Sequence, residues 1–170
     1  MIGRDIVVAA DGMARWAGRR YRCAIGRGGI RVNKTEGDGA TPVGRFALRR
    51  VLYRPDRLPA PPRCHLPIVE IEPQDVWCDD PADAFYNRPI RLRSGARHER
   101  LWRQDHRYDV IVVVGHNDDP PVSGWGSAIF IHLATEAFGP TAGCVAFERT
   151  DLLEILADCD AGCRLLVEAG

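Results

Sequence analysis

The sequence predicts a mainly β fold with one or two short helices. Short runs rich in valine, isoleucine and aromatic residues recur along the chain, and turns containing glycine or proline separate them. The segment near residue 150 most clearly combines a helix-start signal with apolar residues at helical spacing. The 170 residues contain no internal repeat and no low-complexity tract, so we expect a single domain, 1–170.

The first two strands are expected at 6–10 and 21–26, joined through Asp11-Gly12, a dipeptide that favours hairpin turns. Alternating side chains predict a longer strand over 45–53. The run 108–115 is the longest β-branched apolar stretch, so it should form a central strand buried on both faces. We expect 127–133 to be its neighbour, and the two together to form the floor of a site.

Two helices are expected. Ser94 should cap a short one through Ala96 to Arg103. Thr150 should be the N-cap of a clearer one, because its hydroxyl and the Asp151 carboxylate suit the free N–H groups and the dipole of a first turn. Four apolar residues mark the buried side of this second helix: Leu152, Leu153, Ile155 and Leu156. A last strand is expected at 164–168.

A proline-rich stretch around 54–89 separates the expected strands. Its prolines are typical of a linker, yet it also contains apolar residues of the kind that domains bury: Ile68, Val69, Ile71 and Trp77. We therefore expect this stretch to pack on the domain as an insertion.

The charges balance, with 23 lysine and arginine residues against 23 aspartate and glutamate residues. This balance gives no net field that would recruit nucleic acid or an anionic membrane. No apolar stretch is long enough to span a bilayer, so no transmembrane segment is expected. The N-terminal residues lack the charged start, apolar centre and cleavage site of a signal peptide.

Six cysteines raise the alternatives of a disulfide and a metal site. No C-x-x-C pair occurs, and Cys64-His65 and Cys78 are too irregularly spaced for a structural zinc site. We expect no metal, with most of these cysteines reduced and buried. A disulfide between Cys159 and Cys163 stays open, because connectivity cannot be deduced from sequence.

The segment from His132 to Cys144 is the strongest functional signal in the chain. The expected strand 127–133 ends near the histidine, and a turn-rich loop leads to the cysteine. An imidazole beside a thiol indicates acyl transfer through a covalent thioester, with Gly143 permitting a tight turn that aims backbone N–H groups at an oxyanion. The alternative is structural, with His132 capping a strand and Cys144 filling the core.

The surrounding sequence resembles the L,D-transpeptidase catalytic domain family, also called the YkuD-like domain. That family has a histidine, a loop, and then Ser/Thr-x-Gly-Cys with a hydrophobic residue, matched here by His132 and 141–145. Upstream, 34–46 is similar to the family's lysine, glycine-rich turn and Thr-Pro-x-Gly-x-Phe hairpin. Further similarities at 77–88 and 108–127 extend the resemblance over most of the chain.

This resemblance implies the L,D-transpeptidase catalytic-domain fold, mixed β-sheets packed as a sandwich or partial barrel, and acyl transfer on peptidoglycan stem peptides. Cys144 would be the nucleophile and His132 its base, with the backbone of Gly143, Cys144 and Val145 as oxyanion hole. The thioester would pass to an amine acceptor, and no metal or organic cofactor is required. The family works in the periplasm or cell envelope, while the absence of a signal peptide here leaves a cytoplasmic location open.

Two positions depart from the family pattern. Many members carry arginine or asparagine two residues after the nucleophile, where this chain has Ala146, and histidine often follows the Ser/Thr, where it has Ala142. These replacements call into question the contact that those polar side chains make with substrate or with the loop, and Arg149 is a candidate to replace it. The spacing over 132–144 is also shorter than in many members, which implies a trimmed loop.

Other polar residues are candidates for substrate contact. His116 and Asn117 follow the expected central strand, and they either stabilise a turn or touch substrate. Trp125 either stacks on a glycan or packs. Thr141 belongs to the family motif. Lys34 belongs to the glycine-rich hairpin, where backbone geometry is a better explanation than catalysis.

Several functions stay open beside the transpeptidase. If water resolves the thioester, the protein is an L,D-carboxypeptidase or hydrolase. If the site has decayed, with Ala146 as the sign of decay, the protein is a non-catalytic cell-wall-binding relic of the fold. A cysteine-dependent amidase acting on other peptides is a further alternative. The sequence does not predict an oligomeric state.

Overall fold

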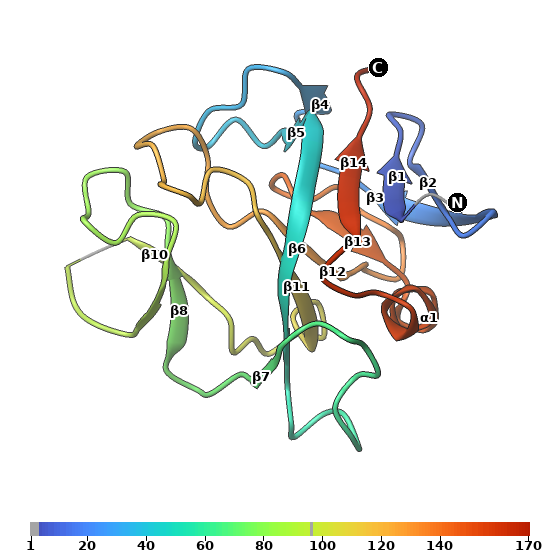
Figure 1. The fold of residues 1–170 in the computed structure, drawn as a ribbon. Coiled ribbons are helices and arrows are strands. Elements are labelled where there is room, and N and C mark those ends of the chain that lie inside the picture. Colours follow the sequence, from blue (N-terminus) through green and yellow to red (C-terminus); the bar gives the residue numbers. More distant parts are fainter. Residues whose placement is uncertain (1–3, 96) are drawn as a thin grey trace.

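A computed structural model describes residues 4–95 and 97–170, and within them the chain is mostly β with one short helix. Most of the described strands belong to one nine-stranded sheet, in the order β11-β12-β13-β3-β2-β1-β14-β6-β7 (Figure 1). The strands of this sheet are β1 (Asp5–Val8), β2 (Met13–Trp16), β3 (Arg19–Ala24), β6 (Gly44–Tyr53), β7 (Ile68–Glu70), β11 (Val110–Val114), β12 (Phe130–Leu133), β13 (Val145–Phe147) and β14 (Arg164–Val167).

Two small sheets and one helix complete the structure. One sheet pairs β4 (Ile30–Arg31) with β5 (Thr41–Pro42). The other has the order β10-β8-β9, with bounds β8 (Asp75–Cys78), β9 (Pro89–Arg91) and β10 (His98–Arg100). The helix is α1 (Arg149–Ala157). Among the described residues, no helix is long and apolar enough to cross a membrane.

The long strand β6 closes the large sheet on itself. Its first half pairs with β14, and its second half pairs with β11, which also pairs with β12. Because β6 has one neighbour along its first half and another along its second half, it must twist between them. The sheet therefore curls into a barrel-like sandwich. The expected sandwich or partial barrel of mixed β-sheets is confirmed.

Strand β11 is buried on both faces, as its sequence predicts. Val110, Val112 and Val114 point into the main core, and Ile111 and Val113 point into a second apolar cluster. The second cluster includes Phe130, Trp77 and Tyr108 and lies under the candidate site. Strand β12 separates the two clusters in the same way.

The start of the chain has one more strand than expected. Asp11-Gly12 does form a turn, but it leads into β2, and a second turn at Ala17-Gly18 leads into β3. The sequence does not predict the strand over Met13–Trp16. Ala14 and Trp16 are buried while Arg15 is exposed, so the missed strand has the alternation typical of one buried face.

The expected helix over 96–103 is wrong. His98–Arg100 is strand β10, with Glu99 opposite Trp77 of β8, so tertiary pairing decides the conformation of this segment. Ser94 is exposed, and Ala96 lies outside the described residues.

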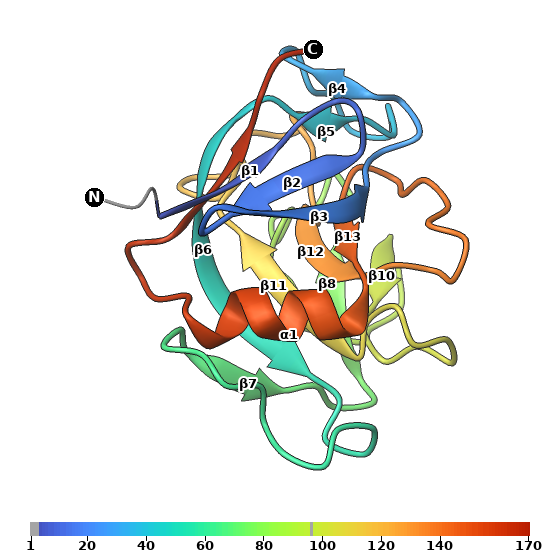
Figure 2. The ribbon, with the colours of Figure 1, turned by 90° about the vertical axis from the view of Figure 1, so that its right-hand side faces the viewer.

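The second expected helix exists, but it begins two residues earlier. Its N-cap is Glu148, and the N–H of Leu152 donates to the Glu148 carbonyl at 2.9 Å. Thr150 is therefore inside the first turn and is not the cap. Leu152, Ile155 and Leu156 are buried in the main core, while Leu153 is half-buried. In the view of Figure 2 this helix lies below β3 and above β7.

The proline-rich segment packs against the rest of the protein. It contains β7 and β8, and Ile71 and Trp77 are buried in the second apolar cluster. Trp77 also donates its indole N–H to Asn87 Oδ1 at 2.9 Å, which ties the two ends of the β8–β9 region together.

Candidate functional site

Strand register brings His132 and Cys144 together. Strands β12 and β13 are parallel, with His132 opposite Ala146 and Ile131 opposite Val145, so Cys144 lies level with Phe130. Side chains two residues apart on a strand share a face, and partners in a parallel pair point the same way. His132 and Cys144 therefore lie on the same face of the sheet, away from the main core.

That face is the floor of a cleft of about 400 Å³. Both His132 and Cys144 line it. The other walls come from distant parts of the chain: the hairpin at 34–37, the region 97–108, and the loop 139–142. The small side chains of Ala128, Ala134 and Ala146 leave the floor open around the histidine and cysteine.

The Cys144 thiol is buried and has two backbone contacts. Sγ donates to the Ala128 carbonyl at 3.3 Å and accepts from the Phe130 N–H at 3.4 Å. Burial raises the pKa of this thiol to about 12, and the nearby charge of Glu99 acts in the same direction. The Phe130 N–H and the Lys34 ammonium oppose this rise. The resting Cys144 side chain is therefore a protonated thiol.

His132 is held as a neutral imidazole. Nδ1 lies 2.9 Å from the Leu133 carbonyl, an acceptor, so Nδ1 carries the proton and Nε2 has a free lone pair. Burial lowers the pKa of His132 to about 4, and the charges of Arg107 and Arg103 lower it further. The Tyr108 ring packs edge-on against the imidazole at 5.1 Å. Within residues 4–95 and 97–170, no hydrogen bond joins His132 to Cys144.

The turn before Cys144 is shaped by Thr141 and Gly143. Thr141 Oγ1 accepts the Gly143 N–H at 3.0 Å and donates to the Cys144 carbonyl at 2.6 Å. Gly143 has a φ of +137°, and a Cβ there would lie 2.8 Å from the Ala40 carbonyl oxygen. Only glycine fits this conformation and this close approach. In the resting structure the Gly143 N–H is engaged by Thr141, so of the three expected oxyanion donors this one is already in use.

The hairpin before β5 contributes a buried ion pair to the cleft. Lys34 Nζ contacts Asp38 Oδ1, and both side chains are largely buried. The Asp38 carboxylate also accepts the Thr35 and Ala40 N–H groups, at 2.9 and 2.8 Å. From the sequence, Lys34 is expected to serve only the geometry of the hairpin. In the structure Lys34 also lines the cleft.

Two carboxylates on the cleft wall were not among the residues selected from the sequence. Glu99 accepts the Tyr108 hydroxyl, and burial raises the pKa of the Glu99 carboxyl. Glu36 accepts the Ser127 hydroxyl at 2.7 Å and also contacts Tyr86. Glu99 lies on β10, a segment that was expected to be a helix. No pattern in the sequence therefore predicted that its side chain lies at the site.

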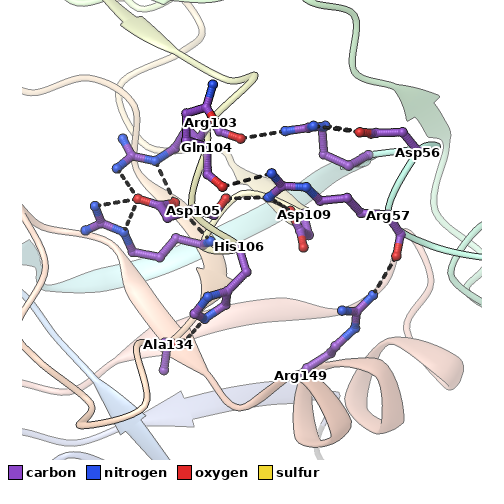
Figure 3. Close-up of polar contacts among 11 residues, drawn as sticks. Asp56, Arg57, Arg103, Gln104, Asp105, His106, Asp109, Ala134 and Arg149 are labelled. Atoms are coloured by element: carbon purple, nitrogen blue, oxygen red, sulfur yellow. Dashed lines mark hydrogen bonds and ion pairs between the residues drawn. The ribbon is translucent and has the colours of Figure 1, made fainter.

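The structure does not bring every candidate to the cleft. Asn117 donates to the Val122 and Gly126 carbonyls, both at 2.9 Å, and His116 Nε2 lies 3.1 Å from the Trp125 carbonyl. These are the contacts of the turn-stabilising alternative. Trp125 is 61% exposed. These three residues do not line the cleft. Arg149 does not line it either, because its guanidinium points to the Arg57 carbonyl at 3.3 Å (Figure 3).

The departures Ala142 and Ala146 both line the cleft. Ala142 is exposed on the loop, and Ala146 is buried directly beside His132 in the β12–β13 pair. Within the described part of the chain, no three His, Cys, Asp or Glu side chains converge as metal ligands. The cysteines, Cys159 and Cys163 included, are free thiols.

Comparison with known proteins identifies a family whose model matches most of the chain. Residues 6–167 match the family model described as YkuD, the L,D-transpeptidase catalytic domain. A solved structure, the helical cell shape determining protein Pgp2 from Campylobacter jejuni, is similar at a TM-score of 0.45 and 14% sequence identity. The similarity covers 96% of this chain and 46% of that chain, so this chain spans about half the length of the Pgp2 structure. No curated protein matches the chain.

Proposed function

Because the chain belongs to the L,D-transpeptidase catalytic domain (YkuD) family, we propose that it is a cysteine-dependent acyl transferase acting on peptidoglycan stem peptides in the cell envelope. The family is one of L,D-transpeptidase-type enzymes. The observation that supports the finer proposal is the parallel register of β12 and β13, which brings the His132 imidazole and the Cys144 thiol to one floor of the cleft.

In the first half-reaction Cys144 Sγ attacks the carbonyl of an L-residue that is followed by a D-residue. The thiol proton passes to His132 Nε2 as the C–S bond forms, because burial disfavours a free thiolate beforehand. The oxyanion takes backbone N–H groups around Cys144 and Val145 as donors. His132 then gives its proton to the departing amine as the C–N bond breaks.

In the second half-reaction an amine acceptor attacks the thioester. His132 takes the proton of the acceptor, the C–N bond of the new cross-link forms, and the cysteine leaves as a thiol. The same chemistry with water yields a carboxylic acid. The products therefore distinguish a transpeptidase from an L,D-carboxypeptidase, and mass spectrometry of the peptides released from a tetrapeptide donor with and without an amine acceptor separates them.

The nucleophile is tested by acylation. A carbapenem has a strained carbonyl whose leaving group stays attached, so a functional site should retain it as a thioester. We expect one adduct per chain in intact-mass measurement, located on Cys144, and no adduct in Cys144→Ala. Activity on a tetrapeptide stem should fall to background in the same variant, while its far-UV circular dichroism stays that of the wild type.

Cys64→Ala is the matched control, since Cys64 is a half-buried thiol outside the cleft. It should keep both the adduct and the activity. A Cys144→Ala protein that retains most of its activity would remove this residue from the mechanism. Adducts spread over several cysteines would instead indicate general thiol exposure.

A further inference from the structure

The loop 103–107 forms the wall of the cleft beside His132. Two contacts attach it to the end of β12: the Leu133 N–H donates to the Arg107 carbonyl at 2.9 Å, and His106 Nε2 lies 2.9 Å from the Ala134 carbonyl. The side chains of Arg103 and Arg107 both line the cleft. The loop therefore places two guanidinium groups next to the proposed base.

Two arginines from the proline-rich segment fix the backbone of this loop (Figure 3). Arg54, which is buried, donates to the Arg103 carbonyl at 2.7 Å. Arg57 donates to the Gln104 and Asp105 carbonyls, at 2.8 and 2.7 Å. Three consecutive carbonyls are thus bound by charged donors, which are among the stronger hydrogen bonds in proteins. Such a loop is a rigid support for the side chains it presents.

Asp105 orients the two cleft arginines but does not neutralise both. Arg103 donates to it through Nε and Nη2, at 3.0 and 2.7 Å, and Arg107 does so through the same two atoms, at 3.1 and 2.9 Å. These two guanidinium groups hold the pKa of Asp105 well below its ordinary value, so the carboxylate stays charged. One negative charge lies between two positive ones. In the described structure Nη1 of each arginine has no protein acceptor.

The position of this pair relative to His132 defines what it could bind. The Arg103 guanidinium lies 5.2 Å from the centre of the Tyr108 ring, which packs against His132. Both arginines are near enough to lower the pKa of the imidazole. Ala134 and Ala146 leave this end of the floor without a polar side chain. The carboxylates Glu36 and Glu99 instead bind hydroxyl groups on the cleft wall.

We propose that Arg103 and Arg107 form a carboxylate-binding site that recognises the free α-carboxylate of the residue released from the donor peptide. The inference rests on the proposed function, in which His132 protonates the departing amine. In a single amino acid the carboxylate is two bonds away from that amine, so an amine at His132 places the carboxylate toward the arginine pair. Asp105 binds Nε and Nη2 of both arginines, and their Nη1 groups are donors suited to a carboxylate.

The test measures binding without turnover, in the Cys144→Ala protein. Isothermal titration calorimetry compares two tetrapeptides of identical sequence, with an L-residue followed by a terminal D-alanine, one ending in a carboxylate and one in a carboxamide. We expect the carboxamide to bind about tenfold more weakly, as for loss of a hydrogen bond to a charged group. The double variant Arg103→Gln/Arg107→Gln should bind both peptides alike. The single Arg103→Gln variant, which keeps the Arg107–Asp105 pair, should reduce the preference partly.

Arg100→Gln is the matched control, because Arg100 is exposed on β10, does not line the cleft, and carries the same charge. It should keep the tenfold preference. Equal affinities for the two peptides in the parent protein, binding of neither peptide, or an unchanged preference in the double variant would overturn the inference. Failure of the proposed function gives a different result: the carboxylate preference persists, but the protein with Cys144 intact forms no thioester.

Discussion

At the scale of single residues, Cys144 and His132 are both electrically neutral in the resting site. Burial disfavours both the Cys144 thiolate and the imidazolium of His132. In the proposed mechanism the proton therefore moves only when a substrate carbonyl is present to accept the sulfur. This differs from a pre-formed thiolate–imidazolium pair, which is expected to react with any small electrophile. The arrangement favours selectivity for substrates that fill the cleft.

The lowered pKa of His132 has a consequence for stability against acid. The folded protein binds the proton more weakly than the unfolded chain, since the pKa of about 4 lies below the ordinary value of 6.5. Its contribution is therefore complete above pH 6.5 and is lost as the pH falls towards 4. We expect the free energy of unfolding in urea to drop by about 3 kcal/mol from this group between pH 7.5 and pH 4.

The His132→Gln variant should lose that share of the pH dependence. His116, whose pKa burial also lowers, contributes in the same direction and remains in this variant. His65→Gln, a change at an exposed histidine, should behave as the wild type. An unaltered acid slope in His132→Gln would show that His132 does not have the lowered pKa.

At this scale the sequence identified His132, Cys144 and Gly143 because each belongs to a local motif. Glu99, Arg103 and Arg107 were not found. Their side chains reach the cleft only because β10 pairs with β8 and because Arg54 and Arg57 hold the following loop. Contacts between segments about 50 residues apart leave no local periodicity from which they could be inferred.

At the scale of elements, the turn 141–144 sets the position of Cys144. Thr141 anchors it to the end of β3, since its N–H donates to the Ile25 carbonyl at 3.0 Å and its carbonyl accepts the Arg27 N–H at 2.8 Å. Within the turn, the threonine hydroxyl bonds at both ends. Gly143 then permits the close approach to Ala40.

Gly143→Ala should therefore damage both stability and chemistry. The added Cβ would meet the Ala40 carbonyl at 2.8 Å, in a backbone conformation that alanine rarely adopts, so the turn must shift. We expect a loss of about 2 kcal/mol in the free energy of unfolding, and acylation of Cys144 slowed by at least about tenfold, because a small displacement of a nucleophile is costly. Urea denaturation and the time course of carbapenem adduct formation measure the two effects.

Gly139→Ala is the comparison in the same loop. Gly139 has no positive φ, and a Cβ there would lie 3.4 Å from Thr135 Oγ1, an ordinary contact distance. This variant should keep wild-type stability to within small changes. Equal losses of stability in the two alanine variants would contradict the role given to Gly143.

The elements were predictable where burial determines them. The apolar run 108–115 and the alternation over 45–53 became β11 and β6, and the apolar stripe after residue 150 became α1. The prediction failed for β2 and β10, which have four and three residues. Strands this short contain too few positions to show a period, and their conformation comes from pairing with neighbours.

At the scale of the whole molecule, the two ends of the chain complete the barrel. Strand β14 lies between β1, which it pairs in parallel, and β6, which it pairs antiparallel. Leu165 and Val167 of β14 are buried in the main core. The sequence could suggest that 164–168 is a strand, but it offered no signal for this insertion between two distant strands, since sheet order depends on contacts across the full chain.

Removing β14 should unfold the protein. Deletion of residues 164–170 would leave the edges of β1 and β6 unpaired and would open the main core to water. We expect no cooperative thermal transition by circular dichroism. Deletion of 169–170 alone keeps β14 and the Glu168 N–H bond to the Val8 carbonyl, so it should melt as the full chain does. A folded protein after the longer deletion would show that the barrel does not need this strand.

The parallel pairing of β12 with β13 makes the distance between His132 and Cys144 in space independent of the number of residues between them along the chain. The gap between His132 and Cys144 in space is set by strand register, whereas their gap along the chain is set by the loop between them. The register of β12 and β13, and not the length of the loop, therefore sets the spacing of His132 and Cys144. We expect that residues 135–140 can be replaced by loops of other lengths and charges, which changes the wall of the cleft while the histidine and cysteine keep their positions.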